Sequence, residues 1–278
     1  MMQTTKAYIQ ETLKRAGLYH RLKASSVYTF YWWFADRSMI ERRHKELSFY
    51  RNLLRGFRKG DLIFDIGANQ GTKTAVFLRL GANVVAVEPD VTNQTVLQQR
   101  YLKYRLARRP VAIVGKAVSD KIAVETMWID EAGSAKNTLN PKWVETLRTD
   151  EERFGHSLTF AQRTEVETVT LNQLMNEYGD PFFIKIDVEG FELSVLRGLQ
   201  RPVPYLSFEV NLPEFLPEGL KCVHLLGSMA ADGRFNYVVD CQKGLELKQW
   251  LPAQEFSNLL ARCHQPSIEV IWKTYAEH

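Results

Sequence analysis

The sequence has few cysteines and no long apolar segment. Its three cysteines, Cys222, Cys241 and Cys263, are widely spaced and form no Cys-x-x-Cys motif. This argues against a zinc site and for a reducing compartment. No run approaches the ~20 apolar residues of a membrane helix, and the N-terminus lacks the continuous apolar region of a cleavable signal. We therefore expect a soluble, cytoplasmic protein.

Internal repeats and linkers rich in Gly, Ser or Pro are also missing, so the 278 residues can bury one large core, with or without an appendage. The net charge of +4 is unevenly distributed. Up to Lys59 the chain has 13 Lys/Arg and 4 Asp/Glu, a net charge of +9, which leaves about −5 for the remainder. We predict a basic helical extension at 1–58 and an α/β domain at 59–278, with a polar insertion at about 131–162.

A short strand, a glycine turn and a helix are predicted near residue 65. Leu62–Ile66 is almost entirely apolar, as in a strand buried on both faces of a parallel sheet, and Asp65 interrupts it near its carboxyl end. Gly67 and Gly71 then precede a predicted helix at Thr72–Leu80. This is the first unit of a doubly wound α/β fold, in which glycines admit a ligand close to the backbone.

Glu88 follows a second predicted strand, Asn83–Val87, at the spacing of about 20 residues where such folds present a carboxylate to a ribose. A dinucleotide fold would have Gly-x-Gly-x-x-Gly, but Asn69 stands at the middle position and no third glycine follows. Asp65 suits the ammonium of an amino-acid group better than a pyrophosphate. These features favour S-adenosylmethionine over a nicotinamide cofactor. The alternative is an ordinary turn without a ligand.

The next segment is predicted to form a helix at Thr92–Leu106 and a third strand at Val111–Val114. Ser119 and Asp120 lie at or just beyond the end of that strand, where a polar side chain can contact an adenine edge. Capping of a turn by Asp120 explains the pattern equally well.

A second group of acidic residues is predicted at the same edge of the sheet. The apolar strand Phe182–Ile186 contains Lys185 and is followed by Asp187 and Glu189, and Glu209 lies near the end of the next strand. Ligands of open α/β sheets bind outside the carboxyl ends of the strands. The carboxylates should therefore share one cleft with the cofactor residues.

Such carboxylates can stabilise a sulfonium and accept a proton from an acceptor hydroxyl. We predict Asp187 as base or acceptor anchor, with Glu189 as its partner and Lys185 and Glu209 nearby. The alternative is that Asp187 caps the next helix while Lys185 pairs with Glu209. Asp187, Glu189 and Glu209 are chemically able to bind a divalent metal, but they form no dedicated ligand set, and we predict no metal site.

The basic extension contains an aromatic cluster at Val27–Phe34, between predicted helices at Thr4–Leu22 and Met39–Phe57. The cluster has three interpretations: packing against the α/β domain, the roof of an acceptor pocket, or peripheral contact with a membrane surface. Nucleic-acid binding is disfavoured because the charges of the extension alternate with apolar helix positions.

Several motifs resemble the FkbM-type methyltransferases. They are Asp65–Gly71, Val87–Pro89, Ala117–Asp120 and Ile184–Glu192 with Leu196–Gly198. The resemblance covers about residues 61–211 and implies a Rossmann-like fold, S-adenosylmethionine as cofactor, and O-methylation of a hydroxylated small molecule or glycan. The chain departs from the family at Asn172, where an aspartate is usual.

The resemblance also assigns site residues. It implies that Asp65, Gly67, Asn69, Gly71 and Glu88 contact the cofactor and that Asp187 and Glu189 lie at the reaction centre. Two other functions stay open: a nicotinamide-dependent oxidoreductase, and a non-catalytic Rossmann-like binding module at a membrane surface.

Overall fold

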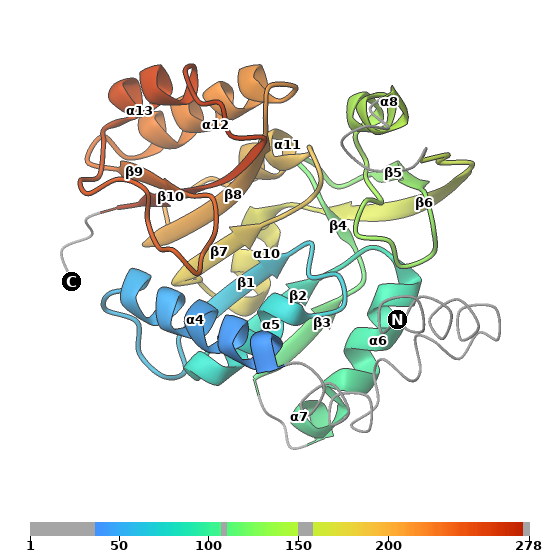
Figure 1. The fold of residues 1–278 in the computed structure, drawn as a ribbon. Coiled ribbons are helices and arrows are strands. Elements are labelled where there is room, and N and C mark those ends of the chain that lie inside the picture. The colour runs from blue at the N-terminus through green and yellow to red at the C-terminus, as the bar shows by residue number, and fades with distance from the viewer. Residues whose placement is uncertain (1–36, 107–109, 150–157, 275–278) are drawn as a thin grey trace.

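A seven-stranded sheet forms the centre of the molecule (Figure 1). The computed structural model describes residues 37–106, 110–149 and 158–274. The strand order is β3-β2-β1-β7-β8-β10-β9; the first five are parallel, whereas β10 pairs antiparallel with both β8 and β9. The predicted α/β, Rossmann-like, mostly parallel fold is confirmed. The predictions for Thr4–Leu22 and Val27–Phe34 lie outside the described residues.

The strands of the main sheet are β1 (Leu62–Ile66), β2 (Asn83–Val87), β3 (Val111–Val114), β7 (Phe183–Ile186), β8 (Tyr205–Asn211), β9 (Arg234–Val238) and β10 (Ser267–Lys273). A smaller sheet has the order β4-β6-β5, formed by β4 (Ala117–Val118), β5 (Val124–Ile129) and β6 (Gln162–Val169). The helices are α4 (Arg37–Leu53), α5 (Thr72–Leu80), α6 (Val91–Arg100), α7 (Leu102–Leu106), α8 (Pro141–Thr149), α10 (Leu171–Tyr178), α11 (Glu192–Arg197), α12 (Leu216–Met229) and α13 (Ala253–Leu260).

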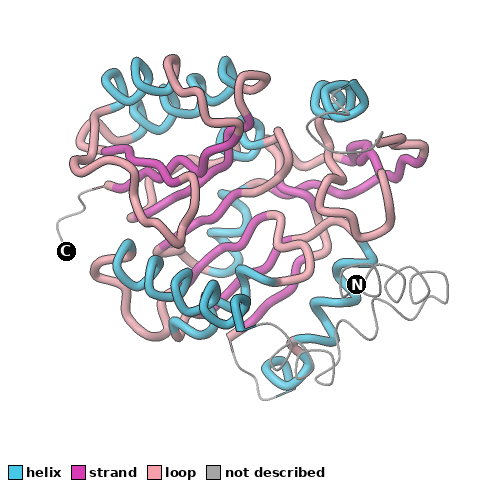
Figure 2. Tube along the Cα trace, in the orientation of Figure 1, coloured by secondary structure: helices cyan, strands magenta, loops and turns pink. Residues whose placement is uncertain are grey.

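Helices cover both faces of the main sheet (Figure 2), and successive strand residues face opposite cores. In β2, Val84 and Ala86 pack with α4 and α5, whereas Val85 and Val87 belong to the core that includes α10 and α12. This alternation follows from the two-residue period of a strand. It explains why the central strands are apolar almost throughout.

Helix α4 lies within the predicted basic extension and is packed into the core. Its Tyr50 is fully buried, with its ring centroid 5.1 Å from that of Phe77 in α5 and 5.8 Å from that of Phe183 in β7. Burial of an apolar ring of this kind contributes roughly 1.5–3 kcal/mol, offset in part because the buried Tyr50 hydroxyl has no hydrogen-bond partner among the described residues. Helix α4 therefore helps to hold the α5 face of the sheet.

Two helix predictions differ from the structure, and one helix was not predicted. The predicted helix at Thr92–Leu106 is interrupted at Tyr101, where the backbone leaves helical geometry (φ −103°, ψ 14°) and α7 begins as a separate short helix. The predicted helix at Met39–Phe57 already ends at Leu53. Helix α13 was not predicted. No helix among the described residues is both long enough and apolar enough to cross a bilayer.

Candidate active site

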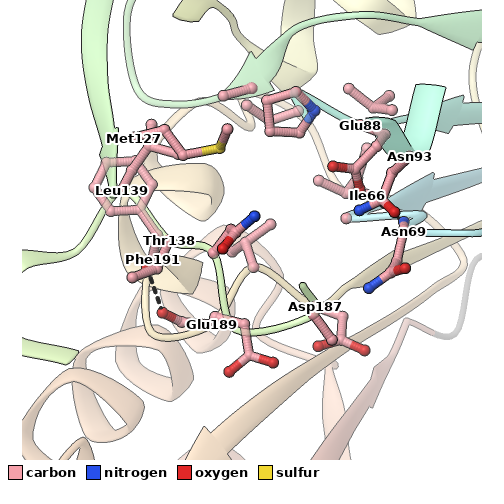
Figure 3. Close-up of a pocket in the computed structure, with 18 of the residues that line it drawn as sticks. Ile66, Asn69, Glu88, Asn93, Met127, Thr138, Leu139, Asp187, Glu189 and Phe191 are labelled. Atoms are coloured by element: carbon pink, nitrogen blue, oxygen red, sulfur yellow. Dashed lines mark hydrogen bonds between the residues drawn. The ribbon is translucent and has the colours of Figure 1, made fainter. Parts of the chain in front are cut away.

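A cleft lies at the carboxyl ends of β1, β2 and β7 (Figure 3). Its other side is formed by Met127 in β5 and by the segment 134–139 that follows it. Several of the predicted site residues share this cleft: Gly67, Asn69, Glu88, Asp187 and Glu189.

The turn after β1 is tied to both neighbouring strands. The backbone N–H groups of Gly67 and Ala68 each donate to the carbonyl oxygen of Val87, at 3.0 Å, and the N–H of Asp187 donates to the carbonyl of Ile66, also at 3.0 Å. Gly67 has a φ of +77°, and a Cβ at this position would lie 1.8 Å from the carbonyl oxygen of Asp187. Only glycine fits here, because the turn passes directly against the backbone that carries the catalytic candidate.

Asn69 continues the turn in the left-handed conformation, with a φ of 49°. Asparagine tolerates this conformation better than most residues because its short amide can bond locally. Here its Oδ1 accepts from the N–H of Gln70 at 2.6 Å. Its own N–H donates to Glu88 Oε2 at 2.7 Å, which links the turn to the end of β2.

Glu88 is buried beside this turn. Its Oε1 accepts from the N–H of Asp90 at 2.9 Å, so each carboxylate oxygen has a backbone donor. Burial raises the pKa of Glu88 to about 7, and the bonds from Asp90 and Asn69 act in the opposite direction. A carboxylate oxygen can accept more than one hydrogen bond, so capacity is left for ligand hydroxyls.

Asn93 also contributes to the cleft, and sequence reasoning missed it. Its side chain is buried, and its amide oxygen has no hydrogen-bond partner among the described residues. An unpaired buried acceptor is costly, and a ligand hydroxyl or amino group in the cleft would satisfy it. Together with Glu88 and the glycine turn, this acceptor fits a nucleoside cofactor. Its sequence signal was weak: Asn93 is the third residue after Asp90, which caps α6.

The start of the predicted insertion covers the cleft. Asp90 Oδ2 accepts from the N–H of Gly133 at 3.1 Å and from Asn137 Nδ2 at 2.9 Å. Thr138 Oγ1 donates to the carbonyl of Glu189 at 2.8 Å, the dashed line in Figure 3. The covering segment is thus fastened both to the cofactor side and to the carboxylate side.

Four predicted cofactor contacts lie outside the residues that form the cleft: Asp65, Gly71, Ser119 and Asp120. Asp65 is buried on the α5 face of β1, where Thr74 Oγ1 donates to it at 2.5 Å. Burial raises its pKa, while Lys185 and Thr74 lower it. Gly71 caps α5 and accepts a bond from Tyr101.

Ser119 and Asp120 lie near the smaller sheet. Ser119 Oγ is 3.1 Å from Glu125 Oε1 and 3.4 Å from Asp120 Oδ1, within hydrogen-bonding range of both carboxylates, and Asp120 is exposed. In this arrangement both residues bond locally. Their predicted contact with an adenine edge stays a prediction.

Three carboxylates predicted as catalytic lie close together: Asp187 and Glu189 line the cleft, whereas Glu209 and Lys185 lie outside the residues that form it. Carboxylate oxygens of Asp187, Glu189 and Glu209 lie within 4.8 Å of one another. Trp143 Nε1 donates to Glu189 at 3.0 Å, and Ser267 Oγ donates to Glu209 at 2.6 Å. The sheet edge therefore gathers them as the sequence predicted.

Lys185 pairs with Asp187, not with Glu209 as the alternative prediction had it. Its Nζ donates to Asp187 Oδ2 at 2.7 Å, and the lysine side chain is almost fully buried. Burial is the largest influence and would raise the pKa of Asp187, but the charge and hydrogen bond of Lys185, together with the charge of Lys73 and a hydrogen bond with Glu209, hold that pKa below its usual value. Asp187 is therefore a stable anion.

The two glutamates have the opposite tendency. Burial raises the pKa of Glu189 well above its usual value, and the charges of Glu209 and Asp187 raise it further. The pKa of Glu209 is also raised, by burial and then by Asp187. One cluster thus contains a fixed anion and two carboxylates with a high affinity for a proton.

Glu192 is a further buried acid that sequence reasoning missed. Its Oε1 accepts from the N–H groups of Val188 and Gly190, at 3.2 and 3.3 Å, and burial raises its pKa to about 8. Within this turn Glu189 has a positive φ of 53°. Glu192 thus supports the loop that aims Glu189 at the cleft.

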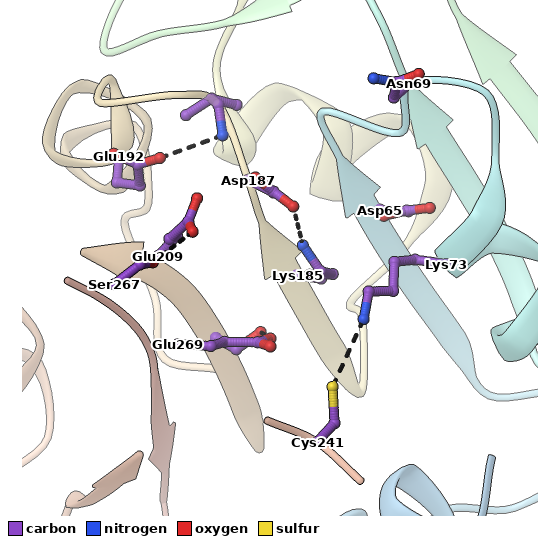
Figure 4. Close-up of polar contacts among 12 residues, drawn as sticks. Asp65, Asn69, Lys73, Lys185, Asp187, Glu192, Glu209, Cys241, Ser267 and Glu269 are labelled. Carbon is purple, nitrogen blue, oxygen red and sulfur yellow. Dashed lines mark hydrogen bonds and ion pairs between the residues drawn. The ribbon is translucent and has the colours of Figure 1, made fainter. Parts of the chain in front are cut away.

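A polar network continues from the cluster along the α4/α5 face of the sheet (Figure 4). Lys73 of α5 pairs with Glu46 of α4 and lies 3.8 Å from Cys241 Sγ. Ser207 Oγ donates to Glu269 at 2.6 Å. These contacts join residues far apart in the sequence, so no local pattern predicted them.

The model of the FkbM methyltransferase domain matches residues 65–220, more than half of the chain. The chain belongs to the FkbM methyltransferase family. It is therefore an S-adenosylmethionine-dependent methyltransferase, and the nicotinamide-dependent alternative is set aside. In this FkbM protein, Glu88, Asn93 and the turn that contains Gly67 are the residues that would hold the nucleoside.

Solved structures similar to this FkbM protein include other methyltransferases. One is precorrin-6y C5,15-methyltransferase from Geobacter metallireducens, with 11% identity, a TM-score of 0.40, and coverage of 84% of this chain and 89% of that one. Another is a TehB-like SAM-dependent methyltransferase from Corynebacterium glutamicum, with 9% identity, a TM-score of 0.42, and coverage of 83% and 87%. A third is a SAM-dependent O-methyltransferase from Thermotoga maritima, with 13% identity, a TM-score of 0.40, and coverage of 84% and 66%. No curated protein matches the chain in sequence.

Glu88→Gln should weaken S-adenosylmethionine binding by ~1.5–3 kcal/mol, the range for hydrogen bonds to a charged group. Glutamine keeps the volume and an acceptor oxygen for one of the two backbone donors, while its NH₂ group would face the other, so thermal unfolding of the variant checks that the fold persists. Calorimetric titration of wild type and variant measures the change, with the exposed Glu246→Gln as control. Equal affinities in the three proteins would show that Glu88 only organises the turn.

Proposed function

We propose that this methyltransferase transfers the methyl group of S-adenosylmethionine to a hydroxyl oxygen of a small molecule or glycan. The observation that carries the proposal is the pairing of Asp187 with Lys185 beside two glutamates with raised pKa values. An acceptor hydroxyl needs a fixed anion to orient it and a second group to take its proton. The cluster offers both.

Asp187 would accept a hydrogen bond from the acceptor hydroxyl and thereby orient its oxygen. The buried Lys185 holds the Asp187 carboxylate in one position. Holding acceptor and cofactor together in the right geometry can supply ~7–11 kcal/mol of a barrier. Glu189 would take the hydroxyl proton, because its raised pKa makes its deprotonated form a stronger base than an ordinary carboxylate. This division of roles refines the sequence prediction, in which Asp187 was base or anchor.

The cofactor, when bound, supplies a sulfonium methyl group that the acceptor oxygen attacks. Glu88 and Asn93 would hold its nucleoside, and the segment 134–139 would exclude water from the reaction. The carboxylates at the cleft also favour the positive sulfonium electrostatically. Only the acceptor's O–H proton has to be moved, and Glu189 receives it.

Two measurements test the proposal. In a thermal-shift panel, S-adenosylmethionine and its demethylated product should each stabilise the protein by ~2.7 kcal/mol at a ligand concentration of 100 Kd, and NAD should not. Incubation with methyl-labelled cofactor and a library of sugars and hydroxylated compounds should then give an O–CH₃ product by mass spectrometry and NMR. Label on carbon or nitrogen alone would overturn the O-methylation proposal.

A further inference from the structure

Helix α7 presents large apolar side chains to solvent. Leu102 is 48% exposed, Tyr104 37% and Leu106 76%. These are three of the seven large hydrophobic residues that are exposed in the described part of the chain, and they lie within five residues. Scattered exposed leucines need no explanation, but a concentration of them indicates an interaction surface.

The sequence around these side chains is basic. Between Asp90 and Asp120 the sequence contains no acidic residue and six basic ones: Arg100, Lys103, Arg105, Arg108, Arg109 and Lys116. Lys103 lies between Leu102 and Tyr104 and is exposed. This stretch is therefore uniformly positive.

Two further helices add arginines next to Arg100. Arg43 of α4 is partly buried, and its pKa is lowered by burial and then by the charges of Arg79 and Arg100. The guanidinium group of Arg43 is thus close enough to those of Arg79 and Arg100 to be repelled by both, while Glu46 acts on it in the opposite direction. In Figure 1, α7 and the N-terminal part of α4 lie on the same side of the molecule. Clustered cations favour an anionic partner.

The support of this surface is rigid. Arg100 Nη1 donates to the carbonyl of Gln70 at 2.5 Å, and Tyr101 OH donates to the carbonyl of Gly71 at 2.5 Å. The ring of Tyr104 packs edge-on against that of Tyr101, with centroids 6.1 Å apart. The end of α6 is thus fastened to the cofactor turn, and α7 projects from a fixed base.

We propose that the α7 surface (Arg43, Arg79, Arg100, Leu102, Lys103 and Leu106) docks on an anionic lipid bilayer. Its cations would attract acidic headgroups, while Leu102 and Leu106 enter the boundary between headgroups and acyl chains. A nucleic acid would use the cations but leave the leucines in water. A second copy of the chain would bring like charges together. The proposal is independent of the acceptor and of the residues 27–34 in which the sequence analysis placed a membrane contact.

The test is flotation of the full chain with vesicles of phosphatidylcholine alone or mixed with phosphatidylglycerol. Wild type should float only with the mixed vesicles, and less as salt is raised. Leu102→Ser/Leu106→Ser and Arg79→Glu/Lys103→Glu should each weaken binding about 10-fold or more. Neither variant changes a residue of the cleft, so both should keep the wild-type Tm within a few degrees.

Matched controls use residues of the same kind elsewhere on the surface. Ile122→Ser/Val124→Ser removes an apolar pair that is 68% and 61% exposed, and Lys221→Glu reverses a charge on α12. Both should float like wild type. The proposal is overturned if wild type does not bind mixed vesicles, if it binds RNA oligonucleotides but not vesicles, or if the α7 variants bind as tightly as the controls.

Discussion

Asp187→Asn should lower methyl-transfer turnover ~100-fold or more while leaving the Kd for S-adenosylmethionine almost unchanged. Asparagine keeps the volume of the side chain but removes the anion that Lys185 holds and that would orient the acceptor hydroxyl. The expected loss lies in kcat, since the residues at the cofactor end of the cleft are untouched. Single-turnover assays with labelled cofactor, combined with calorimetry, separate the two quantities.

Two companion variants sharpen this result. Asp232→Asn changes an exposed aspartate and should keep full turnover. Glu189→Gln should remove the pH dependence expected of a base: wild-type activity rises as pH passes the raised pKa of Glu189, because only the deprotonated form accepts a proton. Near-normal turnover of Asp187→Asn on the true acceptor would instead leave cofactor placement as the main catalytic device.

Gly67→Ala should destabilise the protein by ~3 kcal/mol or more, within the range of severe backbone and packing defects. The added Cβ would lie 1.8 Å from the carbonyl oxygen of Asp187, and the residue would have to keep a φ of +77°. The turn after β1 and the end of β7 would have to move apart. Loss of cofactor binding should accompany the loss of stability.

Gly60→Ala is the matched control for this experiment. Gly60 also has a positive φ, +100°, but nothing lies within 4 Å of the Cβ position. Only conformational strain applies there, roughly 1–2 kcal/mol for a left-handed residue. Urea denaturation of both variants measures the difference. If the two variants lose equal stability, the backbone around residue 67 moves away from Asp187 without a further loss of free energy of unfolding.

The sequence predicted the central strands well because burial on both faces leaves a nearly continuous apolar run. The bounds of β1 and β2, and of the helix after the glycine turn, agree with the structure. The helix after Glu88 was predicted too long, since its apolar spacing continues beyond Tyr101. There the hydroxyl of Tyr101 bonds to the carbonyl of Gly71, a contact that no local pattern contains.

The candidate site was predicted in part, because the positions of the strand ends follow from the predicted strands. Residues that end parallel strands must meet at one edge, so Glu88, Asp187, Glu189 and Glu209 could be grouped in advance. The ion-pair partner of Lys185 could not be decided from the sequence. Asp187 lies two residues further along the chain, and Glu209 lies on the next predicted strand. Asn93 was missed because its role depends on an amide oxygen that has no partner in the described part of the folded protein. Glu192 was missed because its role depends on the conformation of the loop after β7.

The order of the strands in space differs from their order of synthesis. Strand β10 is made after β9, yet it lies between β9 and β8. Its Ser267 holds Glu209, and its Glu269 accepts from Ser207 of β8. While a nascent chain has not yet reached β10, β8 remains an open edge and Glu209 lacks its hydroxyl partner. The acidic cluster is therefore completed only late in translation, after the cofactor turn has already been synthesised.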